Sequence, residues 1–177
     1  MKTIFDKAAN IRLVVFDVDG VLTDGSLYVG ADGQEYKAFY ARDGMGMKML
    51  QATGVIIGII TAKDSPVVTF RMQELGIKHV YQGQLDKLEA FHNLCDQLQL
   101  EPQQVAYVGD DINDIPVMLR VGLAIAVADA HFLVAKHAHW QTKFMGGRGA
   151  AREVCELIMQ AQGTLAAQVN FYEIVNF

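Results

Sequence analysis

The sequence is poor in cysteine, proline and long apolar runs. Among its 177 residues, only two are cysteine, three are proline and one is tryptophan. Cys95 and Cys155 form no C-x-x-C pair, so we expect buried free thiols and neither a disulfide framework nor a dithiol redox motif. No apolar stretch is long enough to cross a membrane, and residues 1–7 lack the apolar segment of a signal peptide. These absences predict a cytoplasmic protein with no membrane partner.

Positive charge is also scarce. Lysine and arginine together number 15 against 20 acidic residues, which gives a net charge of −5 at pH 7, and no basic run occurs. This balance argues against a nucleic-acid-binding surface. The hydrophobic fraction of 51% and the charged fraction of 20% are those of a globular protein. We expect residues 1–177 to form one domain with a substantial core.

Short apolar runs alternate with helical patterns along the chain. Buried strands are predicted at 13–16, 55–60, 78–82, 105–108 and 123–127. Helices are predicted at 45–53, 65–76, 85–98, 113–121 and, after the segment 146–150, to about 162. A β-hairpin is predicted at about 26–39, and a weakly helical tail at 163–177. This alternation indicates an α/β fold with a doubly wound parallel sheet.

Acidic residues follow two of these strands directly. Asp17 and Asp19 come after the first strand, and Asp110, Asp111 and Asp114 come after the fourth. Because ligands of such sheets bind beyond the carboxyl ends of the strands, we expect these side chains to lie together. Ionised carboxylates beside a buried strand need a partner, for which a bound cation is the expected choice. Each acid taken alone also fits a helix cap or an Asx turn.

A calcium-binding loop is excluded at the first of these positions. Counted from Asp17, the sixth and twelfth positions of an EF-hand loop would have to be Gly and Glu. They are Leu22 and Tyr28. The expected cation is therefore not held by an EF-hand loop.

Two further polar residues are expected at the same edge of the sheet. Thr61 follows the second strand, and Lys87 stands near the start of a predicted helix. A hydroxyl donor and an ammonium group both suit a phosphate, and Mg²⁺ prefers oxygen ligands such as carboxylates. Taken alone, Thr61 also fits a loop cap and Lys87 a solvent-facing helix residue, but their joint appearance with the acids favours a phosphate site.

The block D-x-D-G-V-L-T-D at 17–24, with Thr61, Lys87 and G-D-D-x-N-D at 109–114, resembles the four motifs of the haloacid dehalogenase-like phosphohydrolases. The resemblance implies that the catalytic residues are Asp17, Asp19, Thr61 and Lys87. Asp17 would be the nucleophile that forms an aspartyl-phosphate, and Asp19 the general acid and base, which requires it to be protonated when substrate arrives. Mg²⁺ would be held by Asp17, Asp110 and the Asp19 backbone carbonyl, with Asp111 and Asp114 orienting its ligands and waters.

Members of this family usually carry a cap domain at one of two insertion points, and neither gap is long enough here. Segments 22–28, 39–48, 81–88, 127–131 and 146–155 are similar to a capless, homotetrameric, Mg²⁺-dependent group that acts on the phosphate of an eight-carbon keto sugar acid in lipopolysaccharide synthesis. This implies a small-molecule substrate and active sites completed by neighbouring subunits. The implied substrate-binding residues are Asp19, Tyr40, Ala41, Arg42, Asp43, Gly44, Lys48, Lys63, Arg71, Lys87 and Arg148, with the loop of Arg148 closing over a neighbour's site.

One departure from the family's motifs leaves the identity of the substrate undecided. The family usually has T-G-R after the second strand, whereas this chain has Thr61-Ala62-Lys63, and lysine lacks the bidentate geometry of arginine. A phosphatase of a nine-carbon keto sugar acid phosphate is therefore an alternative. A receiver-like phosphoacceptor module is a second one, although receivers place the acidic pair after strand one and the acceptor Asp after a middle strand, the reverse of this order.

Overall fold

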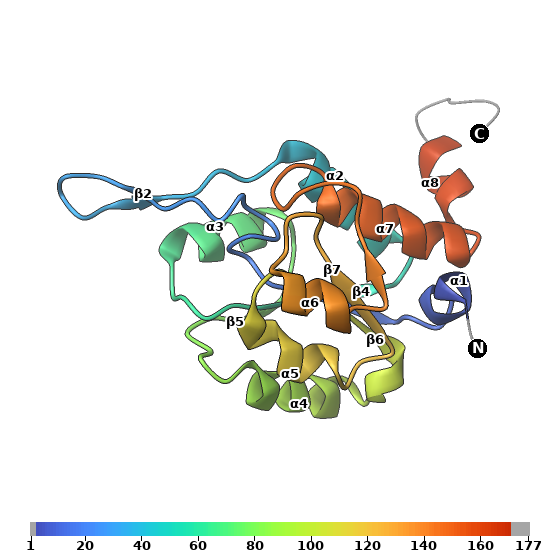
Figure 1. Cartoon of the computed structure of the whole chain (residues 1–177). Helices are drawn as coiled ribbons and strands as arrows, with labels where there is room; N and C mark the ends of the chain where they lie inside the picture. The colour runs from blue at the N-terminus through green and yellow to red at the C-terminus, as the bar shows by residue number, and fades with distance from the viewer. Residues whose placement is uncertain (1–2, 171–177) are drawn as a thin grey trace.

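The computed structural model describes residues 3–170, in which six parallel strands form one sheet in the order β5-β4-β1-β6-β7-β8 (Figure 1). The strands are β1 (Leu13–Phe16), β4 (Ile56–Ile60), β5 (His79–Tyr81), β6 (Val105–Gly109), β7 (Leu123–Ala126) and β8 (Trp140–Gln141). The predicted parallel α/β architecture is confirmed. Strand β8 was not anticipated from the sequence.

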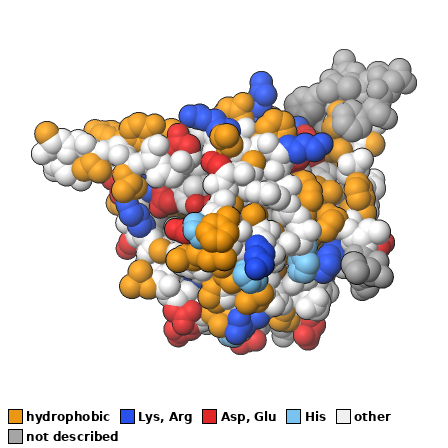
Figure 2. All heavy atoms as spheres, viewed as in Figure 1, with side chains coloured by type: hydrophobic (Ala, Val, Ile, Leu, Met, Phe, Trp, Pro, Cys, Tyr) orange, Lys and Arg blue, Asp and Glu red, His pale blue; other side chains and the backbone are white. Residues whose placement is uncertain are grey.

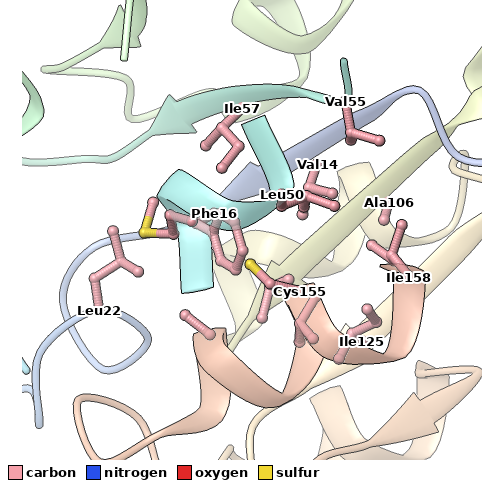
Figure 3. Packing of buried hydrophobic residues seen from close by; sticks show 14 of the residues in the cluster. Val14, Phe16, Leu22, Leu50, Val55, Ile57, Ala106, Ile125, Cys155 and Ile158 are labelled. Carbon is pink, nitrogen blue, oxygen red and sulfur yellow. The ribbon is translucent and has the colours of Figure 1, made fainter. Parts of the chain in front are cut away.

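Strand β1 is the centre of the sheet because it is apolar on both faces. Val14 and Phe16 belong to one buried cluster, whereas Leu13 and Val15 belong to the other, as the two-residue period of a strand requires. Figure 3 shows Val14 and Phe16 together with Leu50, Cys155 and Ile158 from helices that cover this face. The helices that contribute to the first cluster are α1 (Ile4–Ala8), α2 (Ala41–Ala52), α3 (Pro66–Glu74), α7 (Ala150–Ala161) and α8 (Leu165–Asn170). Those on the opposite face are α4 (Lys87–Leu98), α5 (Ile115–Met118) and α6 (Phe132–His137).

The strand order places a crevice at the carboxyl end of β1. The chain runs from β1 to β4 on one side, and later returns to β6 on the other side of β1. At such a switch point the loops leave in opposite directions and open a ligand site between them. The acids after β1 and β6 are therefore brought together by topology.

Two helix predictions differ from the structure. In place of one helix at 113–121 there is a 3-10 turn, η2 (Ile112–Asp114), followed by the four-residue α5. Pro116 is tolerated only in the first turn of an α-helix, which forces α5 to begin there. Helix α2 begins four residues earlier than its predicted start, at Ala41, so Asp43 lies inside it. Helices α1 and α6 and the 3-10 turn η1 (Pro102–Gln104) were not predicted. Of the predicted tail, α8 is helical, and 171–177 lie outside the described residues.

The predicted hairpin is formed by β2 (Tyr28–Val29) and β3 (Glu35–Tyr36), which pair antiparallel. It projects from the body as an arm on the left of Figures 1 and 2. Its apolar side chains are exposed, among them Leu27, Tyr28, Val29 and Tyr36. Between β1 and β4 the chain holds only this hairpin and α2. In the part of the chain that is described, no helix has the length and apolar character needed to cross a membrane.

Candidate active site

Asp17 follows the last residue of β1 and faces the buried amine of Lys87. Its backbone N–H donates to Val108 O of β6 at 3.1 Å, which fixes the turn at the strand end. Asp17 Oδ2 lies 2.8 Å from Lys87 Nζ, and Oδ1 accepts the Val18 N–H at 2.6 Å. Burial, followed by the charge of Asp114, raises the pKa of Asp17 to about 6, although Lys87 opposes the shift. The ion pair with Lys87 favours the ionised form of Asp17.

Asp114 fixes Lys87 from the other side. Its Oδ1 lies 2.7 Å from Lys87 Nζ and accepts the Tyr107 hydroxyl at 2.6 Å. Its Oδ2 accepts the backbone N–H groups of Asp110 and Asp111 at 2.9 and 3.2 Å. Each oxygen of this fully buried carboxylate therefore has two donors. Burial lowers the pKa of Lys87, but Asp17 and Asp114 outweigh that effect and the net shift is upward.

Asp110 has a buried oxygen with no hydrogen-bond partner among the described residues, Oδ1. Burial, reinforced by the charges of Asp17 and Asp114, raises the pKa of Asp110 to about 8. The loop after β1 presses directly on this carboxylate. A Cβ added at Gly20, which has a φ of +91°, would lie 2.1 Å from Asp110 Oδ2, so only glycine fits there.

These carboxylates fit a divalent cation. Ligand oxygens of Asp17, Asp110 and Asp114 all lie within 4.8 Å of one another, and only one ammonium group, that of Lys87, is paired with them among the described residues. Because Asp114 is saturated by its four donors, Asp17 and Asp110 are the side chains left to bind a metal. Mg²⁺ favours a site of this kind, with few carboxylates and several waters.

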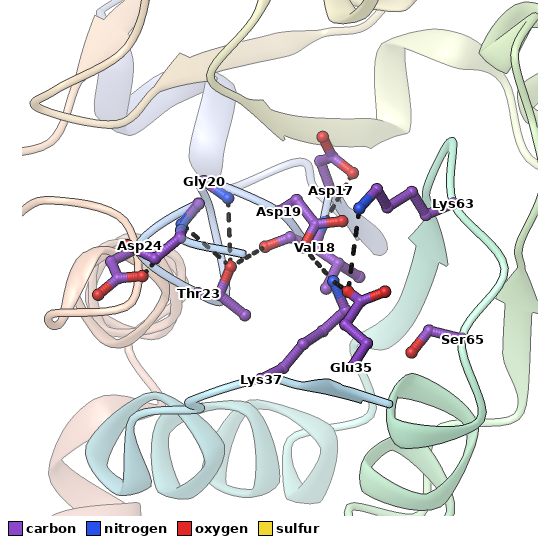
Figure 4. Close-up of polar contacts among 12 residues, drawn as sticks. Asp17, Val18, Asp19, Gly20, Thr23, Asp24, Glu35, Lys37, Lys63 and Ser65 are labelled. Carbon is purple, nitrogen blue, oxygen red and sulfur yellow. Dashed lines mark hydrogen bonds and ion pairs between the residues drawn. The ribbon is translucent and has the colours of Figure 1, made fainter. Parts of the chain in front are cut away.

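Asp19 is held by Lys37, which the sequence analysis missed (Figure 4). The ammonium of Lys37 contacts Asp19 Oδ1 and lies 2.7 Å from Glu35 Oε1, while the Lys37 side chain is only 1% exposed. Lys63 Nζ in turn lies 4.0 Å from Glu35 Oε1. Burial lowers the pKa of Lys37, but the two carboxylates raise it by more. Asp19, Lys37, Glu35 and Lys63 therefore form a row of neighbouring side chains in which negative and positive charges alternate.

Thr61 and Asp111 were also assigned to the site. Thr61 is buried at the end of β4, where its backbone N–H donates to Tyr81 O at 2.9 Å and its carbonyl accepts from Gln84 at 3.0 Å. Asp111 is exposed, and its Oδ1 accepts the Ile112 N–H at 2.7 Å as a cap of η2. Asp111 therefore shapes the loop beside Asp110, and its Oδ1 is engaged by the backbone.

Asp43 has a different environment from the one expected of a substrate ligand. Its carboxylate is buried and accepts the backbone N–H groups of Gly149 and Arg152 at 3.3 and 2.8 Å, at the start of α7. A carboxylate at a helix N-terminus satisfies free N–H groups and is favoured by the helix dipole. Burial raises the pKa of Asp43, and these two N–H groups oppose the rise. Asp43 thereby joins α2 to α7.

The remaining residues assigned to substrate lie around α2 and α3. Arg71 pairs with Glu74 at 2.6 Å and lies over the Phe39 ring, with Gly44 packed against its guanidinium. Tyr40 precedes α2, and Arg42 lies over its ring. Ala41, Arg42 and Lys48 are exposed. Two of the basic residues predicted to bind substrate are linked to the acids after β1. Lys87 pairs directly with Asp17. Lys63 is linked to Asp19 through the ion pairs of Glu35 and Lys37, and within residues 3–170 no ion pair links the other predicted basic residues to either acid.

The glycine-rich loop before α7 packs on the loop that follows β1 of its own chain. That it also closes over a neighbouring subunit's site stays a prediction. The Gly147 N–H donates to Val21 O at 2.9 Å, and a Cβ at Gly146 would lie 1.7 Å from Gly20 O. Arg148 pairs with Asp24 at 3.3 Å in the same chain. Glycine at positions 146 and 147 allows this close backbone packing.

Three residues of the site had weak sequence signals. Lys37 and Glu35 are two residues apart in the predicted hairpin, so they face the same side, and that spacing could have raised them as a pair. Tyr107 carries the one hydroxyl in the run 105–108, and a buried hydroxyl needs a partner. Nothing in the sequence names the partners of these side chains.

Comparison with known proteins agrees with this geometry. Residues 56–153 match the family model described as haloacid dehalogenase-like hydrolase. The 3-deoxy-D-manno-octulosonate 8-phosphate phosphatase of Yersinia pestis is 52% identical over 162 residues, which are 92% of this chain and 87% of that protein. Its counterpart in Escherichia coli K12 is also 52% identical, over 90% of this chain and 85% of its own length.

A solved structure of the phosphatase of the same name from Moraxella catarrhalis, in complex with magnesium, phosphate and KDO, has a TM-score of 0.94 at 41% identity. The similarity covers 96% of this chain and 97% of that one. With its parallel sheet and its acids after β1 and β6, this chain belongs to the haloacid dehalogenase-like hydrolases.

Proposed function

We propose that this chain is a Mg²⁺-dependent phosphatase that hydrolyses 3-deoxy-D-manno-octulosonate 8-phosphate to the free sugar acid and phosphate. The support is the identity to phosphatases of that name over about nine-tenths of the chain. A role in lipopolysaccharide synthesis and a cytoplasmic location are part of the proposal. The two free, buried cysteines are consistent with a reducing compartment.

One observation carries the reaction type: an ionised carboxylate, Asp17, faces a lysine that is fixed by a second carboxylate. Lys87 is 2% exposed, so its charge is not dispersed by water. A phosphate monoester is anionic and repels a carboxylate nucleophile unless positive charge is supplied beside it. Lys87 supplies that charge, and Thr61 at the end of β4 supplies a hydroxyl donor.

Asp17, Asp110 and the Asp19 backbone carbonyl are the groups that would hold Mg²⁺. The bound cation would neutralise charge on the phosphate oxygens. Asp110 Oδ1, which has no hydrogen-bond partner among the described residues, supports this assignment. Burial and the charges of Asp17 and Asp114 raise the pKa of the Asp110 carboxyl, and a bound cation would relieve that penalty on the ionised form. Asp114 keeps Lys87 and the backbone of residues 110 and 111 in place.

The chemistry then runs in two steps. An oxygen of Asp17 attacks phosphorus, the bond from phosphorus to the sugar oxygen breaks, and Asp19 gives its proton to the departing alkoxide. Asp19 next takes a proton from water, whose oxygen attacks phosphorus and breaks the bond to Asp17. Inorganic phosphate leaves, and Asp19 is protonated for the next turnover.

A homotetramer whose subunits complete one another's sites is a further part of the proposal. The hairpin exposes Leu27, Tyr28, Val29 and Tyr36, and an isolated two-stranded hairpin is marginally stable in water. Contact with a second copy would cover these side chains. Light scattering after gel filtration measures the assembly, and a fully active monomer would contradict it.

The test of the proposed reaction is phosphate release in the presence of Mg²⁺ from a panel of sugar phosphates. The panel includes the eight- and nine-carbon keto sugar acid phosphates, because Lys63 stands where the family usually has Arg. A strong preference for the eight-carbon compound is expected. Preference for the nine-carbon compound would retain the phosphatase and reject the substrate, whereas accumulation of a stable phospho-aspartate without turnover would indicate a receiver-like module.

A further inference from the structure

Lys37 brings a buried ammonium into the site from the hairpin. Its side chain is 1% exposed and lies between two carboxylates, those of Asp19 and Glu35. An unpaired ammonium in a protein interior is costly, so lysine is tolerated there only with charged partners. These contacts distinguish Lys37 from an ordinary surface lysine.

The strand geometry of the hairpin sets the direction of this side chain. Glu35 is the first residue of β3, and Lys37 follows the end of that strand. Residues two apart in a strand face the same side, and the residue between them faces the other. Tyr36 is accordingly 56% exposed, while Glu35 and Lys37 point toward the sheet (Figure 4).

Asp19 has a single ion-pair partner among the described residues, and it is Lys37. Lys37 is fixed from behind by Glu35, and Glu35 lies 4.0 Å from Lys63 in the loop after β4. The direction of the Asp19 carboxylate therefore depends on where the hairpin holds Lys37. No residue that binds phosphate or metal in the proposed reaction supplies this contact.

We propose that Lys37 is a positioning residue for Asp19, which fixes the carboxylate that exchanges protons with the leaving group and with water. This inference rests on the proposed function, because it takes Asp19 as the acid and base. A proton donor must lie within about 2.6–3.2 Å of its acceptor, and a carboxylate free to rotate is out of reach for part of the time. Lys37 acts through Asp19 and touches no reacting atom itself.

The experiment compares two substrates that differ in their need for a proton. The alkoxide of a sugar phosphate must be protonated as it leaves, whereas the nitrophenolate of p-nitrophenyl phosphate leaves without one. The parameter kcat/KM reports the steps up to departure of this first product. Lys37→Met is expected to lower kcat/KM for the sugar phosphate by about 10- to 100-fold, and for p-nitrophenyl phosphate by less than about threefold.

Three variants complete the test. Lys37→Arg keeps a cation and is expected to recover most of the loss. In an Asp19→Asn background, Lys37→Met is expected to cause no further loss, because the group it positions is gone. Lys78→Met removes an exposed lysine before β5, at the opposite edge of the sheet, and is expected to leave kcat/KM unchanged.

Several outcomes would overturn the inference. They are an equal loss on both substrates, no loss on either, or an additional loss in the Asp19→Asn background. If Lys37→Met fails to fold, the double variant Glu35→Gln, Lys37→Met removes one charge of each sign and the same two substrates are compared. Wild-type protein that hydrolyses p-nitrophenyl phosphate but no keto sugar acid phosphate would reject the proposed substrate alone, and glycerol phosphate then serves as the alkyl ester.

Discussion

Lys87 and Lys37 each bring a buried ammonium to a carboxylate beyond the end of β1, but their surroundings differ. Lys87 begins α4, a helix of 12 residues, and the side chains of its partners Asp17 and Asp114 are 8% and 0% exposed. Lys37 follows a strand of two residues, and the side chains of Asp19 and Glu35 are 25% and 28% exposed. Water thus reaches the carboxylate partners of Lys37 and barely reaches those of Lys87.

This difference matches the tasks that the proposed reaction gives to the two carboxylates. A nucleophile works best when it is fixed and desolvated beside a positive charge. A group that exchanges protons with a leaving group and then with water must be reached by both. The first network is accordingly built on the helix and sheet, and the second on the exposed hairpin.

The largest loss of activity is expected when the carboxylates themselves are replaced. Asp17→Asn removes the nucleophile and should lower kcat by at least about 10³-fold, and Asp19→Asn should fall slightly short of that loss. Phosphate release at saturating substrate measures both. Wild-type activity in Asp17→Asn would show that the nucleophile has been misassigned.

Replacing each lysine in turn by methionine should distinguish the two networks by the loss in the free energy of unfolding. Lys87→Met leaves Asp17 and Asp114 facing each other in the interior, and it should lower the free energy of unfolding by about 3–5 kcal/mol. Lys37→Met leaves partly hydrated carboxylates and should cost about 1 kcal/mol or less. Urea denaturation of each variant measures the difference, and equal losses would break the comparison.

Mg²⁺ should stabilise the first network in a pH-dependent way. The pKa values of about 6 for Asp17 and about 8 for Asp110 lie above the ordinary value of 3.8, so the metal-free folded protein holds more protons than the unfolded chain. Its stability should therefore fall as pH rises from about 4 to about 8. Since Mg²⁺ binds the ionised carboxylates, the increase in melting temperature that it causes should grow over the same range.

The control for that measurement is Asp110→Asn, which removes the carboxyl with the higher pKa. We expect this variant to lose most of the gain from Mg²⁺ and much of the pH dependence above about pH 6. A gain from Mg²⁺ that is larger at low pH than at high pH would contradict the assignment of these carboxylates as ligands.

Within the network of Lys87, Asp17 and Asp114, the smallest effect expected is that of Tyr107→Phe. The change removes the hydroxyl that donates to Asp114 Oδ1 at 2.6 Å and leaves Lys87 and both backbone donors in place. It should lower the free energy of unfolding by about 1–2 kcal/mol. A loss as large as that of Lys87→Met would mean that the hydroxyl, more than the amine, holds the buried carboxylate.

Much of the fold was predictable because it depends on local patterns. The apolar runs at 13–16 and 105–108 have no polar residue to satisfy other than the Tyr107 hydroxyl, so they become central strands. Helix boundaries were less predictable where a side chain was engaged elsewhere. Asp43 precedes the helix predicted at 45–53, but it lies inside α2 and accepts from the backbone N–H of Arg152, a residue 109 positions away.

The sequence by itself determined the parallel sheet and put Asp17 and Asp110 at one edge of it, because residues that follow parallel strands share the carboxyl edge. The strand order, which makes β1 and β6 neighbours, was decided by the tertiary structure. Only the tertiary structure decided which lysine pairs with which carboxylate. Lys87 meets Asp17 and Asp114, and Lys37 meets Asp19, through folding of segments distant in the chain. The physical reason is that a buried charge is tolerated only where several elements deliver its partners together, and no local pattern encodes that arrangement.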